Sequence, residues 1–414
     1  MPDASGELLF YTEAELQRDG TMSPDLNIEA VRPSRLFAPD ALRGLIMALM
    51  ALDHANLFVA HKHATGEMWG GPFPVYHDPL TFLTRLVTHL CAPGFFLLMG
   101  IGMVLLAHSY RQRGWSRWAV TRFFVIRGAV LIALKLLVVN RAWELAPGGW
   151  GIQVYIGVLF ALGACMILGS LLLWLKPALL LGATLVLMIG TELLMPNPSQ
   201  WGARLGVARL LLLVPGGIMG SGGQAVLWSY YPVLPWLKLV TLGMVFGYWL
   251  AENRDNAFRR AWKLGLAFLA AFVVLRYLNG FGNIRPRMGN SGYSVSPLGG
   301  WIDFLNVVKY PPSIVFTLIT TGINLILLGL LGHVGQQAQR WLRPLTVFGQ
   351  TPLFFYVVHL FLYATMGKLL APQGTSIVAM YPYWLLGLAM LYPLCLWYGR
   401  LKARQPLGSI WRLL

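Results

Sequence analysis

Apolar runs of about twenty residues recur along the chain and are separated by short polar segments. A helix needs about 20 apolar residues to cross the hydrocarbon core of a bilayer. We therefore expect an all-α polytopic integral membrane protein. The pattern predicts membrane-spanning helices near residues 41–60, 80–107, 119–139, 150–173, 177–195, 226–250, 260–279, 310–332, 346–369 and 380–399.

One further segment leaves the number of spans open between ten and eleven. Residues 202–224 ("GARLGVARLLLLVPGGIMGSGGQ") are less apolar, contain two arginines and end in a Gly-rich stretch. We expect either a short eleventh span or a re-entrant segment, which a membrane tolerates only where protein or a water-filled cavity surrounds the backbone. The re-entrant form would keep the basic cluster at 253–263 in the cytosol.

Composition supports this class of protein, because 57% of the residues are hydrophobic and only 12% are charged. The formal net charge of +16 does not indicate nucleic-acid binding, since lysine and arginine cluster between the apolar runs. That is the pattern of the positive-inside rule, and it predicts cytosolic N- and C-termini in a plasma membrane. We expect no cleaved signal peptide, a polar cytosolic tail at 1–36, and one transmembrane domain at 37–414 that contacts the bilayer.

Ionisable residues inside the spans are the candidate functional residues, because each costs about 2.5–3.5 kcal/mol at a helix centre. In the first span, helical spacing places Asp40, Arg43 and His54 on one face. Asp40 and Arg43 are one turn apart near the cytosolic end and are expected to pair. Asp53 points in another direction, and we expect it to anchor a neighbouring helix or to face the outer vestibule.

The second span repeats this arrangement. Arg85 and His89 are four residues apart on one face, and Pro93 is expected to interrupt the helix just after His89. The two helices run in opposite directions and are joined by a short loop. His54 and His89 are therefore expected at similar depth.

A third intramembrane histidine, His359, lies near the middle of its span with Tyr356 on the same face. Three histidines at one depth favour a functional site. A neutral imidazole can act as a general base, and an arginine can balance an oxyanion or a phosphate. No serine or cysteine is clearly partnered with a histidine. We expect no metal site, because acidic or thiolate co-ligands at regular spacing are missing.

Several blocks resemble a known family. "DALRGLIMALMALDHA" (40–55) resembles the opening helix of the transmembrane acyltransferase superfamily, which begins Asp-x-x-Arg-(Gly/Ala) and ends near a histidine. The blocks "DPLTFLTRLVTHLCAPGFFLLMG" (78–100), "VVKYPPSIVFTLITTG" (307–322) and "VFGQTPLFFYVVHLFL" (347–362) resemble bacterial proteins related to the catalytic domain of heparan-α-glucosaminide N-acetyltransferase.

The resemblance implies that an acyl group, often acetyl, passes from cytosolic acyl-CoA to a glycan or other hydroxyl or amine acceptor outside the cytosol. His54 corresponds to the superfamily's first-helix histidine. In the family's lysosomal enzyme that position holds Asn, and the proposed catalytic histidine lies further on, where this chain has His61, His63 and His77. The resemblance therefore leaves the choice of catalytic histidine open.

Taken together, these observations give two sets of candidates. The candidate catalytic residues are His54, His89, Asp53 and His77. The candidate residues for binding substrate or acyl-CoA are Asp40, Arg43, Arg85, Tyr356, His359, Arg111 and Arg113, the last two lying in a cytosolic basic cluster suited to the phosphates of CoA.

Two alternatives remain open from the sequence. In a proton-coupled membrane transporter the same histidines and Asp53 would relay protons, although no inverted repeat with matching broken helices is evident. A structural subunit would leave the buried charges unexplained. A homodimer is compatible with the sequence, and the acceptor cannot be named from it.

Overall fold

The computed structural model describes residues 36–64, 67–70, 74–149, 151–195, 206–285, 300–405 and 409. Apart from Leu36, the expected cytosolic tail lies outside these residues. Among the residues described, eight helices are long and apolar enough to cross a membrane, and two shorter apolar helices add to them. The prediction of an all-α polytopic membrane protein is confirmed.

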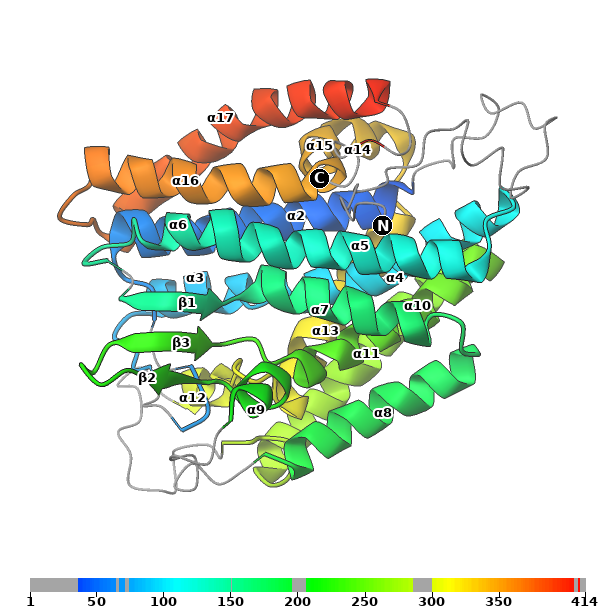
Figure 1. Cartoon of the computed structure of the whole chain (residues 1–414), viewed down its shortest axis with the longest axis horizontal. Coiled ribbons are helices and arrows are strands. Elements are labelled where there is room, and N and C mark those ends of the chain that lie inside the picture. The colour runs from blue at the N-terminus through cyan, green and yellow to red at the C-terminus, as the bar shows by residue number, and fades with distance from the viewer. Residues whose placement is uncertain are drawn as a thin grey trace, which may run out of the picture.

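The long helices run up and down, and most neighbours along the chain are antiparallel (Figure 1). Two of them contain π-helical turns near one end, η1 (Asn56–Ala60) after α2 and η2 (Lys135–Val139) after α5. The spans are α2 (Phe37–Ala55), α3 (Pro79–Thr88) with α4 (Cys91–Gln112), α5 (Arg117–Leu134) with α6 (Asn140–Trp143), α7 (Val158–Leu172), α8 (Pro177–Leu193), α10 (Val233–Glu252), α11 (Arg254–Leu278), α13 (Ile314–Gly332), α16 (Pro352–Leu370) and α17 (Ile377–Arg404).

Helices α2, α4, α10 and α13 form the centre of the bundle, because most of their residues are buried. Helices α5, α11 and α17 lie at the periphery and keep most of their apolar side chains exposed, among them Val273, Val274, Leu385 and Leu386. A face of this kind is stable only against lipid, so these helices contact the bilayer.

A small sheet covers one end of the bundle (Figure 1). Its strands are β1 (Ile152–Ile156), β2 (Gly216–Met219) and β3 (Ala225–Ser229), in the order β1-β3-β2, with β1 parallel and β2 antiparallel to β3. The predicted spans at 150–173 and 226–250 therefore begin as strands rather than helices. Gly148, Gly149 and Gly151 before β1 have positive φ angles, which helices do not accommodate.

The segment 202–224 forms neither of the structures that we expected. Its described part, 206–224, contains the short helix α9 (Val207–Leu212) and strand β2, so it is neither an eleventh span nor a re-entrant segment. Helix α8 ends and α10 begins at the same end of the bundle (Figure 1). The helices on either side of this segment therefore keep the directions that a re-entrant segment would have given them.

The opposite end of the bundle holds the short helices α14 (Gln336–Trp341) and α15 (Arg343–Gln350), and α12 (Gly300–Leu305) lies near the sheet (Figure 1). Helix α15 packs directly on α2 at Gly44, where an added Cβ would lie 1.7 Å from the carbonyl oxygen of Leu345. Beside this contact, Arg43 forms the expected ion pair with Asp40 at 3.0 Å and also donates to the carbonyl of Gly349 at 2.9 Å. The pair therefore fastens α15 to the start of α2.

Candidate active site at the sheet end of the bundle

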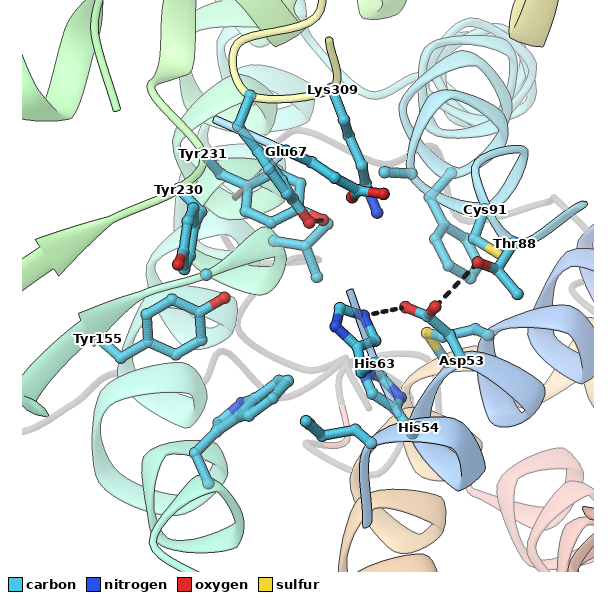
Figure 2. A pocket seen from close by; sticks show the side chains of 18 of the residues that line it. Asp53, His54, His63, Glu67, Thr88, Cys91, Tyr155, Tyr230, Tyr231 and Lys309 are labelled. Carbon is cyan, nitrogen blue, oxygen red and sulfur yellow. Dashed lines mark hydrogen bonds and ion pairs between the residues drawn. The ribbon is translucent and has the colours of Figure 1, made fainter. Parts of the chain in front are cut away.

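A partly enclosed cavity of about 130 Å³ lies where the central helices meet the sheet and the connecting segments. Figure 2 shows that its side chains come from both sides, the α2 and α3–α4 side and the strand side. Its polar and aromatic lining residues are Asp53, His54, His63, Glu67, Thr88, Cys91, Lys135, Trp143, Tyr155, Tyr230, Tyr231, Lys309, Tyr310 and Tyr356.

One wall of the cavity is organised by Arg85 of α3, which is 1% exposed and lies behind the lining residues. Its guanidinium binds both oxygens of Glu67, with Nε to Oε1 at 2.7 Å, and it also pairs with Asp53 of α2. His89 adds a third contact to Glu67 at 3.1 Å. One buried arginine therefore holds two carboxylates, which is the arrangement that makes buried charge tolerable.

Burial alone would raise the pKa of the Glu67 carboxyl. The charge of Arg85, the neighbouring His89 and their hydrogen bonds outweigh that effect and hold the pKa of Glu67 well below its usual range. Glu67 therefore belongs to the ion-pair network as a carboxylate.

The break between α3 and α4 places these residues. Helix α3 ends at Thr88 and α4 begins at Cys91, so the interruption falls at His89 and Leu90, as expected from Pro93. Asn324 of α13 donates to the carbonyl of Leu90 at 3.1 Å, which satisfies a backbone group at the break.

His54 meets His359 of α16, with Nδ1 and Nε2 2.7 Å apart. His359 Nδ1 lies 2.9 Å from the carbonyl oxygen of Phe355, which can only accept, so His359 Nδ1 carries the proton. Neutral His359 then accepts through Nε2, and His54 donates through Nδ1. His54 Nε2 is left with a free electron pair, and it has no hydrogen-bond partner among the described residues.

The sequence analysis placed His54 near His89, and the structure corrects this pairing. His89 belongs to the Glu67 network and packs on Phe316 of α13. His54 instead packs against the tilted ring of His359 and edge-on against Trp143.

A second imidazole faces the cavity from the connection after η1. His63 lies 3.4 Å from Asp53 Oδ2, while Thr88 donates to Asp53 Oδ1 at 2.8 Å (Figure 2). Asp53 therefore anchors α3 to α2 and also lines the cavity. A carboxylate behind an imidazole fixes its tautomer and stabilises its protonated form.

The opposite wall is aromatic. Tyr155 of β1, the adjacent Tyr230 and Tyr231 after β3, and Tyr310 before α13 pack ring against ring, with centroids 5.0–6.0 Å apart for the contacts that join them. Tyr356 lines the same cavity from α16. Flat rings of this kind offer apolar faces to a sugar, and their hydroxyls offer hydrogen bonds.

Two lysines enter the cavity on this side. Lys135 of η2 bonds to the side-chain oxygen of Asn140, and its ammonium lies 4.3 Å from the centre of the Tyr155 ring. Lys309 lies beside Tyr310, whose backbone pairs with the segment that carries Glu67 through Tyr310 N to Glu67 O at 3.2 Å.

Some predicted residues lie elsewhere. His77 is exposed and does not line the cavity, and Asp40 and Arg43 lie at the far end of α2. Arg111 is exposed at the end of α4, where it donates to the carbonyl of Trp115 at 2.6 Å, and Arg113 follows it there. The structure therefore does not bring these residues to His54.

Four charged or titratable residues that line the cavity were not among the candidates predicted from the sequence, namely His63, Glu67, Lys135 and Lys309. Lys309 lies inside the block 307–322 that carried the resemblance, and Lys135 is a lone cation in an apolar span, so both signals were present. Glu67 and His63 lie in a connection, where sequence spacing does not report which helix they contact.

Comparison with known proteins gives the family. The family of heparan-alpha-glucosaminide N-acetyltransferase catalytic regions matches residues 35–277, which is more than half of the chain. The chain belongs to this family. The matched region contains Asp53, His54, His63, Glu67 and Arg85.

Two curated relatives share parts of this region. Human heparan-alpha-glucosaminide N-acetyltransferase is 28% identical over 217 residues, which cover 50% of this chain and 30% of the human protein. The mouse protein of the same name is 30% identical over 148 residues, or 35% of this chain and 20% of its own length. The chain thus matches less than a third of either relative.

Proposed function

We propose that this protein is a membrane-bound acyltransferase that moves an acyl group, acetyl in the first instance, from acyl-CoA to a hydroxyl or amine of a glycan or similar acceptor. The observation that carries this proposal is the pair of imidazoles, His54 and His63, which face one cavity and are held by different buried partners. Membership of an acetyltransferase family supports the same reaction class.

The proposed orientation places the sheet end outside the cytosol and both termini inside it, in a bacterial plasma membrane. Positive charge supports this orientation, because Arg111, Arg113 and the cluster at 253–263 lie at the turns away from the sheet (Figure 1). Arg111 and Arg113 would then meet the phosphates of a cytosolic donor.

In the proposed reaction His63 is the general base. His63 takes the proton from the acceptor's O–H or N–H while that oxygen or nitrogen forms a bond to the acyl carbonyl carbon. The carbon–sulfur bond of the thioester then breaks, and the departing sulfur receives the proton from the imidazolium. Asp53 stabilises the charged imidazole between these two transfers.

His54 positions the acceptor in this scheme. Its Nε2 accepts a hydrogen bond from the second N–H of an attacking amine or from a neighbouring hydroxyl of the acceptor, because the hydrogen bonds from His54 through His359 to Phe355 leave that nitrogen unprotonated. His54 was among the candidate catalytic residues. Of the two imidazoles that line the cavity, His54 and His63, only His63 contacts a carboxylate, and we therefore assign the proton transfer to His63.

The size of the cavity limits what it holds. Pockets for drug-sized ligands measure roughly 300–1,000 Å³, whereas this cavity measures about 130 Å³. It therefore suits only the reacting ends of two substrates, the acyl thioester and the hydroxyl or amine of the acceptor. Met50, Ala92 and Phe95 give it an apolar side against which an acetyl methyl group would pack.

The test is acetyl transfer from labelled acetyl-CoA to glucosamine by purified protein in detergent. We expect His63→Ala and Asp53→Asn each to lower kcat by roughly 10²–10⁴-fold, and the double variant to lose little more, because the two residues act as one unit. His77→Ala, an exposed histidine of the same region, is the control and should keep full activity. Unchanged kcat in His63→Ala would overturn the assignment of the base.

A further inference from the structure

Lys309 is a buried cation without a counter-charge in contact with it. It is 4% exposed and lines the cavity. Among the described residues its ammonium has no hydrogen bond or ion pair, and it lies over the ring of Tyr310, with Nζ 5.0 Å from the centroid. A ring face offsets only part of the cost of removing an ammonium from water.

The carboxylates of the cavity are already engaged by other groups. Glu67 receives three contacts, two from Arg85 and one from His89. Asp53 pairs with Arg85, accepts a hydrogen bond from Thr88 and contacts His63. Neither carboxylate lies within ion-pair distance of Lys309, although Figure 2 places all three side chains around the same space.

Four further acids belong to this end of the bundle, Asp78, Glu144, Glu192 and Asp303, and none of them forms an ion pair with Lys309. The sequence segments 65–66, 71–73, 196–205 and 286–299 contain no aspartate or glutamate. A bound anion would supply the contacting counter-charge that the described residues do not give to Lys309.

We infer that Lys309 determines acceptor specificity by binding an anionic group, a carboxylate, sulfate or phosphate, next to the sugar hydroxyl or amine that is acylated. This inference rests on the proposed function. Lys309 belongs to the connection before α13 and lies beside Tyr310, whose ring contacts that of Tyr230, one of the rings that would hold the sugar. Lys135 reinforces the preference, because its own partners, Asn140 and the Tyr155 ring, are uncharged.

The position of Lys309 favours the acceptor, rather than the acyl donor, as the molecule that carries the anionic group. The cationic groups that suit the phosphates of CoA lie at the other end of the bundle, beyond the length of α4. The cavity is also too small to take the nucleotide part of CoA together with a sugar. The anion beside Lys309 is therefore assigned to the acceptor.

The experiment measures binding of glucosamine 6-sulfate, glucosamine and CoA to the full-length protein in detergent at constant ionic strength. We expect wild-type protein to bind the sulfated sugar about tenfold or more tightly than glucosamine, as one charge-assisted hydrogen bond would give. Lys309→Met should abolish this ratio, and Lys309→Arg should retain part of it. Lys368→Met, which removes an exposed lysine near the sheet end of α16, should leave the ratio unchanged.

Two results would overturn the inference. One is an unchanged preference for the sulfated sugar in Lys309→Met. The other is weaker binding of CoA in that variant with unchanged binding of both sugars, which would assign the anion to the donor. Because binding is measured without turnover, an absence of acetyl transfer would count against the proposed function and leave the test of Lys309 intact.

Discussion

Removal of the Arg85 side chain is the perturbation whose effect the structure defines most sharply. Arg85→Met keeps a long apolar stem in place and deletes the guanidinium that binds Asp53 and Glu67. Both carboxylates then stay buried without their shared cation. His63 and His89 remain as their neighbours, but an imidazole is charged only when it binds a second proton.

The size of the effect follows from the burial of the network. Breaking one buried ion pair by removing a partner costs about 3–5 kcal/mol. Arg85 is 1% exposed and serves two carboxylates, so we expect a loss of free energy of unfolding at or above the upper end of that range. The loss should exceed that of Glu67→Gln, which removes one of the two charges and keeps a hydrogen-bonding group.

The assay is equilibrium unfolding of purified protein in mixed micelles, followed by circular dichroism. Arg85→Met combined with Glu67→Gln is the informative control, because it removes one of the stranded charges and should recover part of the lost stability. A double variant as unstable as the sum of the two single variants would refute the account, since independent sites add and a shared network does not.

Three further predictions concern the same framework. The depressed pKa of Glu67 means that its stabilising contribution is present above the unfolded value of about 4.3 and is lost as pH falls through the lower folded value, so the wild-type Tm should fall on acidification below about pH 4 by more than that of Glu67→Gln. Gly44→Ala should destabilise by about 1–3 kcal/mol or more in unfolding experiments, because its Cβ would meet the Leu345 carbonyl, whereas Gly102→Ala, with open space around it, should not. His359→Phe should lower kcat roughly tenfold or more, with little change in fold by circular dichroism, because it removes the acceptor that fixes the His54 tautomer; unchanged kcat would show that the tautomer is irrelevant.

Much of the fold was predictable because membrane spans are encoded locally. Twenty apolar residues specify a span whatever surrounds them, and all ten predicted spans correspond to helices. The spacing of Arg85 and His89 also predicted that their side chains lie on one face of the helix, and both contact Glu67. The effect of Pro93 on the helix followed from its missing N–H.

The partners of those residues were not predictable in the same way. Whether His54 meets His89 or His359 depends on the rotation of α2, α4 and α16 about their axes, which is set by packing across the bundle. The depth of a residue in the membrane follows from the rise of 1.5 Å per residue along its helix. Many side chains share one depth, so depth alone does not identify which of them are in contact.

The strands were missed because their residues are as apolar as those of the spans that follow them. Ile152–Ile156 alternates in a way that suits a strand, yet it joins α7 without a charged boundary. Lys309 was missed because one cation in an apolar block gives no sign of whether it pairs. Its missing partner is visible only in three dimensions.

The central claim is that the cavity at the sheet end of the bundle transfers acyl groups across the membrane. Its most direct test uses proteoliposomes with the cytosolic end facing inward, labelled acetyl-CoA inside and glucosamine outside. We predict labelled N-acetylglucosamine outside with wild-type protein and background levels with His63→Ala of equal abundance. Equal label outside with both proteins, or no label with wild-type protein that binds acetyl-CoA, would contradict the claim.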